Sequence, residues 1–332
     1  MSRPPRATPT DAELADAARL LQRGGVVAFP TETVYGLGAD ATNPVAVARI
    51  FEIKNRPRFD PLIVHVESTI AARALAAHWP DHAARLAERF WPGPLTLVMP
   101  RRHELIPDIV TAGLPTVALR VPAHPVALDL IRRSGVPIAA PSANRFGSVS
   151  PTTAAHVRES LGEAVDLILD GGSATCGVES TIISLAGARP ALLRSGALPI
   201  EAIEEWIGPV ERLDAKESRD AMGSNGARPR APGMLDRHYA TATPLHLRGN
   251  DPAGLVASRC GRLCFTTPDD AEVWRAVEVL SPSGDLREAA VGLFAAMRRL
   301  DALGLDAIIA DRFPQHGLGL AINDRLRRAA RQ

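Results

Sequence analysis

The sequence predicts an α/β protein with two domains. Short apolar runs alternate with amphipathic stretches of helical length, a pattern typical of a sheet covered by helices. The apolar periodicity fades over residues 208–243, which are rich in Gly, Pro, Ser and charge, and resumes from Pro244. A chain of 332 residues is long enough to form two separate cores.

The first predicted elements are a helix over residues 11–22 and a strand over residues 25–29. Thr10 and Glu13 have the spacing of a capping box, and Gly24 follows the helix as a stop signal. The run after it is short and continuously apolar, which favours a buried strand.

A second helix is expected to begin at Asn43 and Pro44, a cap followed by a first-turn proline, and to end near Lys54. Residues 62–66 are apolar on both faces apart from His65, which predicts a central strand. Further strands are expected at 95–99, 117–121, 136–140, 165–169 and 181–185, and helices near 69–78, 81–90, 124–134 and 152–161.

These patterns place an N-terminal domain at residues 11–207, a linker at 208–243 and a smaller α/β domain at 244–332. Within the smaller domain we expect strands at 245–247, 262–265 and 307–310, and helices at 286–303 and 320–331.

The overall composition argues against several classes of protein. The formal net charge is only +1, whereas a protein that binds long nucleic acid by itself more often has a basic surplus. No apolar run approaches the roughly 20 residues of a membrane span, so no membrane partner is expected. The polar start MSRPPRATPT does not resemble a secretory signal, which favours a cytoplasmic location.

Three cysteines are too few for a disulfide framework in a chain of this length. Cys260 and Cys264 have no second Cys/His pair with zinc-site spacing, so a zinc site is not expected. We expect both of them, and Cys176, to be small buried residues of a reduced protein.

The commonest nucleotide-binding and catalytic motifs are missing. Neither of the two lysines, Lys54 and Lys216, follows a glycine, so the sequence has no Walker A loop. Residues 36–41 match the G-x-G-x-x-A dinucleotide pattern, but six residues separate Gly36 from the preceding strand, which argues against a Rossmann turn and a nicotinamide site.

Polar segments of small residues instead lie where predicted strands end or begin. They cover residues 30–38, 140–144, 147–151 and 177–182. A segment of a different kind, Lys54–Arg58, carries three cations. A helix C-terminus readily explains one cation but less readily three. Because glycines and hydroxyls let a polyphosphate approach the backbone closely, the residues predict an α/β enzyme with an anion-rich ligand.

Two polar residues inside predicted strands have open interpretations. His65 is either a hydrogen-bonded core histidine, which is the commoner case, or a ligand-binding residue. Arg120 ends an apolar strand, where an unpaired guanidinium would be costly, so it needs an anionic partner. That partner is either an internal carboxylate or the carboxylate of a ligand.

Taken in order, these segments resemble the threonylcarbamoyl-AMP synthase family, of the YrdC type with a C-terminal extension. The matching stretches are FPTETVYGLGADA, KNRPRFDPLIVHV, FWPGPLTLVM, ALRVP, APSAN with GSVSPT, GVESTI, LLRSGAL, PGMLDRHYA in the linker and NDRLRRA at 323–329. The resemblance extends from about residue 11 to the C-terminus. It implies a YrdC-like domain with a twisted mixed sheet, followed by a Rossmann-like C-terminal domain.

Matched position by position, the resemblance implies two sets of binding residues. The threonine pocket is expected at Thr33, His65, Arg120, the backbone of Ala140, and Ser180. Nucleotide contacts are expected at Lys54, Arg56, Asp60, Thr116, Ser142, Asn144, Ser150, Arg194 and Tyr239, with Lys54 and Arg56 as the catalytic cations. Arg120 would pair with the threonine carboxylate.

The implied reaction forms threonylcarbamoyl-AMP and pyrophosphate from L-threonine, bicarbonate or CO2, and ATP. The product would pass to a tRNA threonylcarbamoyl transferase complex that forms threonylcarbamoyladenosine next to the anticodon, and direct tRNA binding is left open. Mg²⁺ is expected with ATP, although no carboxylate cluster requires a metal. Residues 222–240 are expected to form a lid over the labile product, hinged at Gly223, Gly226 and Gly233.

The sequence departs from the family pattern at four places near the expected site. Asn55 stands for the glycine of the KGRP motif, Phe59-Asp60 for Asp-Asn, Arg145-Phe146 for Leu-Ser, and Thr241 for a proline. A carboxylate at Asp60 would repel phosphates unless it faces Mg²⁺ or contacts the ligand through its backbone. Thr241 is expected to loosen the lid.

Three other functions fit parts of the pattern. A double-stranded RNA-binding module without ATP turnover would use the concave polar surface of such a sheet, but the near-zero net charge argues against it. Carbamoyl transfer in hydrogenase maturation requires an acylphosphatase-like segment and zinc-binding cysteine pairs, which the sequence lacks. A short-form paralogue is disfavoured by the linker and the second domain.

Overall fold

The computed structural model describes residues 8–212, 238–251 and 253–331. Within them, the N-terminal domain is built on one mixed sheet of ten strands in the order β10-β9-β8-β4-β5-β3-β6-β2-β1-β7. The strands are β1 (Val27–Phe29), β2 (Gly36–Asp40), β3 (Ile63–His65), β4 (Leu95–Pro100), β5 (Thr116–Arg120), β6 (Ile138–Ala139), β7 (Leu167–Ile168), β8 (Thr181–Ser184), β9 (Ala191–Arg194) and β10 (Glu211–Arg212).

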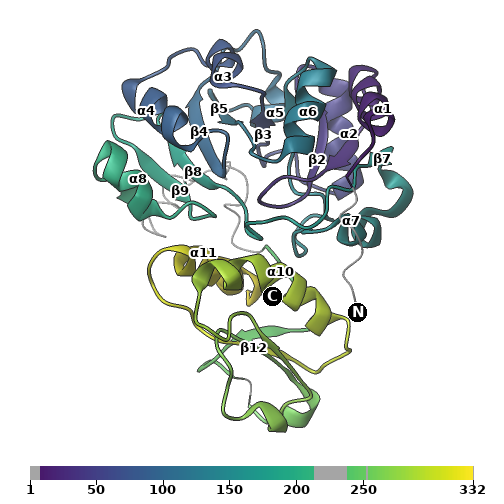
Figure 1. Cartoon of the computed structure of the whole chain (residues 1–332), viewed down its shortest axis with the longest axis vertical. Coiled ribbons are helices and arrows are strands. Elements are labelled where there is room, and N and C mark those ends of the chain that lie inside the picture. The colour runs from purple at the N-terminus through teal and green to yellow at the C-terminus, as the bar shows by residue number, and fades with distance from the viewer. Residues whose placement is uncertain (1–7, 213–237, 252, 332) are drawn as a thin grey trace.

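Helices cover this sheet, as Figure 1 shows. They are α1 (Asp11–Gln22), α2 (Pro44–Lys54), α3 (Thr69–Leu75), α4 (Asp81–Phe90), α5 (Asp108–Thr111), α6 (Pro125–Ser134), α7 (Ala154–Leu161) and α8 (Ile200–Ile207). The capping box predicted for the first helix is confirmed, because the Thr10 hydroxyl accepts from the Glu13 amide and the Glu13 carboxylate accepts from the Thr10 amide. The Asn43 side chain caps α2, also as predicted.

Strand alternation decides which side chains enter the core and which reach the other face of the sheet. Val64, Leu97 and Leu119 belong to the main hydrophobic core, which the helices complete. Their neighbours in sequence point the opposite way, since successive side chains of a strand alternate between faces. His65 and Arg120 therefore lie on the face away from the main core, at the ends of the parallel pair β3 and β5, where they stand opposite each other in register.

The C-terminal domain has a parallel sheet of four strands in the order β11-β14-β12-β13. Its elements are β11 (Leu245–Leu247), β12 (Gly261–Cys264), β13 (Ala276–Val279), α10 (Leu286–Asp301), β14 (Ile308–Ala310) and α11 (Leu318–Ala329). Figure 1 shows α10 and α11 between this small sheet and the N-terminal domain. One hydrophobic core includes Val149 and Val178 of the large domain together with Phe294 and Ile322, so the two domains are packed against each other.

The predicted fold class is confirmed, and the predicted strands and helices are present with ends shifted by a few residues. The strands β2, β9, β10 and β13 and the helices α5 and α8 were not predicted from the sequence. The G-x-G-x-x-A match at 36–41 is mostly strand β2, antiparallel to β1. A Cβ at Gly38 would lie 2.6 Å from both Phe29 and Ile138, so this glycine is required by packing.

All three cysteines are free; Cys260 and Cys264 are buried as predicted, whereas the prediction of burial was wrong for Cys176, which is partly exposed. Among the described residues, no helix combines the length and the apolar character needed to cross a bilayer.

Candidate functional site

A cavity of about 530 Å³, its open mouth included, lies on the face of the large sheet opposite the main core. It forms where several strands end or begin, because the carboxyl ends of β3 and β5 meet there and the segments after β1 and β6 and before β8 join them. Its lining residues are Thr31, Thr33, Val34, Gly36, Arg56, Ile63, His65, Arg120, Ala140, Pro141, Ser142, Glu179, Ser180, Arg194, His238 and Tyr239.

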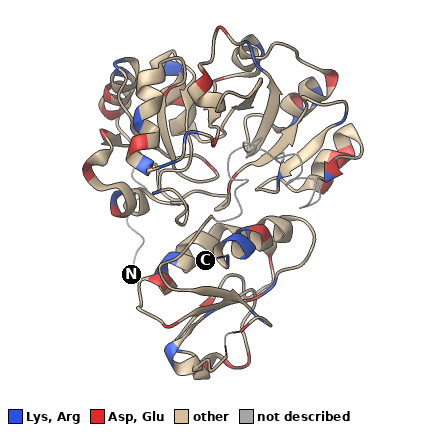
Figure 2. Cartoon of the chain, turned by 180° about the vertical axis from the view of Figure 1, so that it is seen from behind, with Lys and Arg blue, Asp and Glu red and all other residues tan. Residues whose placement is uncertain are grey.

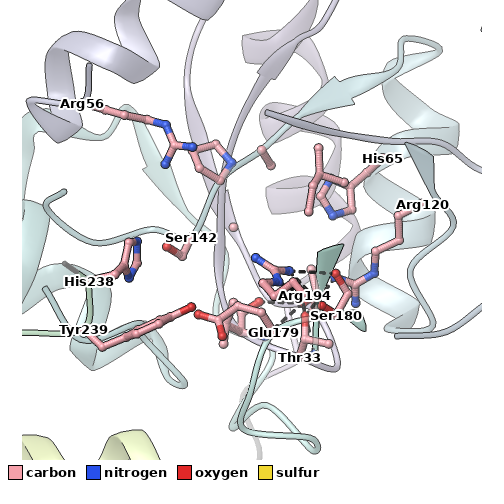
Figure 3. A pocket seen from close by; sticks show the side chains of 16 residues that line it. Thr33, Arg56, His65, Arg120, Ser142, Glu179, Ser180, Arg194, His238 and Tyr239 are labelled. Atoms are coloured by element: carbon pink, nitrogen blue, oxygen red, sulfur yellow. Dashed lines mark hydrogen bonds between the residues drawn. The ribbon is translucent and has the colours of Figure 1, made fainter. Parts of the chain in front are cut away.

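The cavity has two ends (Figure 3). Thr33, His65, Arg120 and Ser180 gather at one end, and Arg56, Ser142, His238 and Tyr239 gather at the other, with Arg194 and Glu179 between them. All five residues predicted to bind threonine line this cavity, as do Arg56, Ser142, Arg194 and Tyr239 of the predicted nucleotide set.

At the first end, the Arg120 guanidinium is held in a fixed orientation. Its Nη1 donates to the Thr33 hydroxyl (3.0 Å) and its Nε to the Gly93 carbonyl (3.2 Å). Nη2 lies 2.7 Å from a Glu32 carboxylate oxygen, and both side chains are more than nine-tenths buried. Arg120 therefore has an internal carboxylate partner and still lines the cavity. Glu32 was not among the predicted site residues.

His65 stands next to Arg120 as a neutral imidazole. Burial, with the positive charge of Arg120, lowers its pKa to about 3. Its Nδ1 is buried without a hydrogen-bond partner among the described residues, although the ring lines the cavity. A buried polar atom of this kind is costly unless something binds it, so His65 is suited to hydrogen-bond a ligand.

Ser180, at the first end, is bound to Arg194, which lies between the two ends. The Arg194 guanidinium donates to the Ser180 carbonyl (2.9 Å) and hydroxyl (3.1 Å), and that hydroxyl also lies 2.8 Å from the Thr96 hydroxyl. Burial lowers the pKa of Arg194 to about 10, which still leaves it a cation at neutral pH.

At the second end, Arg56 is oriented by its own loop. Its Nη2 lies 2.8 Å from the Asp60 carboxylate and 3.0 Å from the Pro61 carbonyl, and its guanidinium lies over the Phe146 ring. Asp60 is fully buried and does not line the cavity, so its side chain contacts Arg56 rather than open space. Asn55 has φ of 52°, a left-handed conformation that asparagine tolerates better than most residues, which explains how it replaces a glycine here.

Lys54 is buried and does not line the cavity. Its ammonium donates to the backbone carbonyls of Ser142 (2.6 Å) and Asn144, so it holds the segment that follows β6. Burial lowers its pKa well below the usual lysine value. Asn144 extends the same structure, because its amide donates to the carbonyls of Arg145 and Ser148.

His238 and Tyr239 reach the cavity from the segment before the C-terminal domain. The Tyr239 ring stacks on Phe294 of α10, with 5.4 Å between centroids, and contacts the His238 ring. Tyr239 has φ of 64°, which is uncommon for a large side chain and requires support from its surroundings. Thr241, where the family pattern has a proline, donates its hydroxyl to the Thr243 carbonyl at 2.6 Å.

Glu179 lines the cavity and, like His238, was not among the predicted site residues. One of its oxygens accepts from the Ser150 hydroxyl at 2.6 Å, and the other is 3.0 Å from Arg325 of α11. Burial alone would raise its pKa, but the charges of Arg325 and Arg194 with the Ser150 hydrogen bond lower it to about 2. Glu179 is thus an anion that connects Ser150 to the C-terminal domain.

Five predicted residues lie outside the cavity lining: Lys54, Asp60, Thr116, Asn144 and Ser150. Thr116 lines a separate hollow with Val98 and Leu193. Most of the predicted lid, including Gly223, Gly226 and Gly233, lies outside the described residues. In the described part of the chain no group of three metal-ligating side chains occurs.

Two family descriptions together match nearly the whole chain. The family described as Telomere recombination, of Sua5, YciO and YrdC proteins, matches residues 19–196, and the family described as Threonylcarbamoyl-AMP synthase, C-terminal domain, matches residues 198–331.

Relatives of similar length match this chain across both of these regions. The chain is 44% identical over 331 residues to the threonylcarbamoyl-AMP synthase of Bacillus subtilis (strain 168), covering 96% of this chain and 93% of the relative. It is also 44% identical over 323 residues to the threonylcarbamoyl-AMP synthase of Pyrococcus abyssi (strain GE5 / Orsay), covering 95% of this chain and 93% of that relative. The crystal structure of P. abyssi Sua5 complexed with L-threonine superposes with a TM-score of 0.88 at 41% identity, covering 98% of this chain and 96% of that one.

Proposed function

The chain belongs to the threonylcarbamoyl-AMP synthase family with a C-terminal domain, and on this premise we propose how its cavity joins L-threonine, bicarbonate or CO2, and ATP. The observation that carries the proposal is that Arg120 and Arg56 line the same cavity, with Arg194 between its two ends. The substrates are anions that repel each other, and fixed cations at both ends offset that repulsion.

Threonine occupies the end formed by Thr33, His65, Arg120 and Ser180. Its carboxylate pairs with the Arg120 guanidinium, whose orientation is already set by Thr33 and Glu32. The unpartnered Nδ1 of the neutral His65 ring is available for the threonine hydroxyl. The relative's structure with bound L-threonine supports placing the amino acid in this fold.

The triphosphate occupies the other end, against Arg56, Ser142 and Arg194, beneath His238 and Tyr239. The buried apolar cluster of Ile63, Val98, Ala118, Ile182 and Leu193 extends from this cavity to the hollow that contains Thr116. In this proposal the adenosine lies along this cluster and contacts Thr116, which lines that hollow and not the main cavity.

The reaction needs no covalent enzyme intermediate. The threonine nitrogen takes up CO2 and loses protons to give a carbamate, and a carbamate oxygen attacks the α-phosphorus of ATP. The bond from the α-phosphorus to the bridging oxygen breaks, and pyrophosphate leaves. The chain's residues align the two reactants and stabilise the charge on the leaving group.

Mg²⁺ enters with the triphosphate as part of the substrate in this proposal. Glu32, Asp60 and Glu179 are carboxylates beside the site, and each is paired with an arginine. The side chains around the cavity therefore provide no cage of their own for a divalent cation. When bound, the ion would neutralise phosphate charge.

The product would pass to a tRNA threonylcarbamoyl transferase complex. Basic and acidic residues are interspersed over the ribbon in Figure 2, which gives no support to the alternative of a double-stranded RNA-binding module.

Pyrophosphate release from ATP tests the function. We expect release that requires both L-threonine and bicarbonate, together with incorporation of labelled bicarbonate into an acid-labile adenylate. L-Serine should replace threonine poorly. Release at the same rate without threonine would refute the proposal.

A further inference from the structure

The C-terminal domain contributes a buried cation that reaches the site. Arg325, on α11, is fully buried, and its guanidinium contacts two residues of the catalytic domain and Tyr239 of the segment between the domains. Nε and Nη2 lie 3.0 Å from one oxygen of Glu179, and Nη1 donates to the Ser195 carbonyl, next to Arg194. The guanidinium also lies 5.7 Å from the centre of the Tyr239 ring.

The carboxylate that Arg325 holds faces the cavity. Glu179 lines the cavity, and its second carboxylate oxygen accepts a hydrogen bond from the Ser150 hydroxyl. Because Arg325 holds Glu179 in place, it also holds the Ser150 hydroxyl in place. In Figure 3 the hydroxyl end of Tyr239 points toward Glu179. Arg325 is not itself a lining residue, so any effect on the reaction passes through these neighbours.

The same domain fixes the two segments that carry Glu179 and Ser150. A Cβ on Gly177 would lie 2.3 Å from the Ala290 carbonyl of α10, so the backbones touch there. Arg298 of α10 donates to the Val149 carbonyl at 2.5 Å. Phe294 of the same helix supports the Tyr239 ring.

We propose, on the basis of the function above, that Arg325 is a positioning residue for the triphosphate. It neutralises Glu179 and holds it away from the phosphates. It thereby prevents Glu179 from drawing Arg194 toward itself, and it keeps Tyr239 in place. Without Arg325, Glu179 is a buried anion whose nearest cations are those that the triphosphate needs. The C-terminal domain is then needed for nucleotide binding, whereas threonine binding at the other end of the cavity does not depend on it.

The test compares Michaelis constants in pyrophosphate release. Arg325→Met should raise the KM for ATP about tenfold or more, because a buried anion is left without its partner, while the KM for threonine changes by less than about threefold. Arg327→Met is the matched control on the same helix, since Arg327 is exposed and donates to the carbonyl of Asn323 in its own helix. It should behave as the wild type.

The double variant Glu179→Gln/Arg325→Met separates positioning from simple support of the fold. Removing both charges should restore much of the lost ATP affinity, because the uncompensated anion is gone. Arg325→Lys keeps the positive charge but loses the planar guanidinium that reaches Glu179 and Ser195 together. It should give an intermediate KM for ATP at a melting temperature near that of the wild type. It also tests the proposal if Arg325→Met does not fold.

A wild-type KM for ATP in Arg325→Met or Arg325→Lys would overturn the proposal. So would equal increases in the KM for ATP and the KM for threonine, or a double variant whose KM for ATP is as high as that of Arg325→Met. These outcomes differ from a failure of the proposed function, in which the wild-type chain itself releases no pyrophosphate in response to threonine.

Discussion

Arg120, on the wall of the cavity, forms a buried ion pair with Glu32 behind it, with 2.7 Å between Nη2 and Oε1. Arg120 also binds Thr33, so the guanidinium is oriented before any ligand arrives. The two interpretations of Arg120 that the sequence left open, an internal salt bridge and a ligand contact, are therefore compatible: Glu32 takes one edge of the guanidinium, and the residue still lines the cavity.

Arg120→Ala should abolish the dependence of pyrophosphate release on threonine while weak ATP binding remains. The reason is that the carboxylate of threonine loses its cation and Glu32 is left to repel it. Kinetics with varied threonine, together with equilibrium ATP binding, provide the measurement. Arg262→Ala is the control, because Arg262 is also buried and paired with aspartates but lies in the C-terminal domain. Normal turnover by Arg120→Ala would mean that the threonine pocket is misplaced.

Lys54→Met should raise the KM for ATP about tenfold or more and also lower the free energy of unfolding by about 1–3 kcal/mol, since two buried carbonyls lose their donor. Kinetics and urea unfolding measure the two effects. Arg49→Met is the control: Arg49 is a cation on the same helix, and it pairs with Asp166 outside the cavity. Unchanged stability in Lys54→Met would instead favour a direct contact between Lys54 and phosphate.

Stability should fall as the pH drops from about 6.5 toward 4.5. Burial lowers the pKa of both His65 and His238 to about 3 in the folded chain, so below pH 6.5 the unfolded chain binds protons that the folded chain does not. Each histidine contributes stability that is fully present above pH 6.5 and is lost as the pH falls toward 3, at up to about 1.4 kcal/mol per pH unit.

Urea unfolding at pH 7.5, 6.0 and 5.0 measures this slope. His238→Gln should make it shallower, and substitution of the exposed His103 should leave it unchanged. An identical slope in wild type and His238→Gln would contradict the burial of a neutral imidazole at that position. The measurements stay above pH 4.5 because the pKa of Glu179 is lowered to about 2 in the folded chain. Below pH 4.5 the stability that Glu179 contributes would also begin to be lost, and the two effects would mix.

Gly177→Ala should loosen the packing between the domains. Its Cβ would lie within 2.4 Å of backbone atoms of α10, and the residue has φ of 73°. Gly304→Ala is the matched control, with φ of 62° and no atom near the added Cβ, and should cost only the backbone strain of about 1–2 kcal/mol. Gly177→Ala should cost about 1–3 kcal/mol more in unfolding experiments, because α10 must move. Equal losses would show that the contact is unimportant.

Much of the site could be predicted because its residues lie at strand ends. The segments at 30–38, 140–144 and 177–182 were recognised from their small polar residues, and the sheet brings all three to one cavity. His65 and Arg120 were singled out as polar residues inside apolar strands, and the structure adds that strand alternation turns them away from the core that Val64 and Leu119 enter. The resemblance to a known family supplied the roles.

The rest could not be read from the sequence because it depends on contacts between distant segments. Glu179 and Arg325 are 146 residues apart, and neither local pattern indicates that they pair. The Glu32 ion pair with Arg120 is of the same kind. Strand β13 was missed because its four residues, AVEV, are only partly buried and carry a weak apolar signal.

A structure of this chain with L-threonine and a non-hydrolysable ATP analogue would test the shared cavity most directly. We predict that the threonine carboxylate lies on Arg120, that the triphosphate contacts Arg56 and Arg194, and that the amino acid nitrogen faces the α-phosphorus. Threonine and nucleotide bound in separate hollows, with Arg120 contacting only Glu32, would contradict this arrangement.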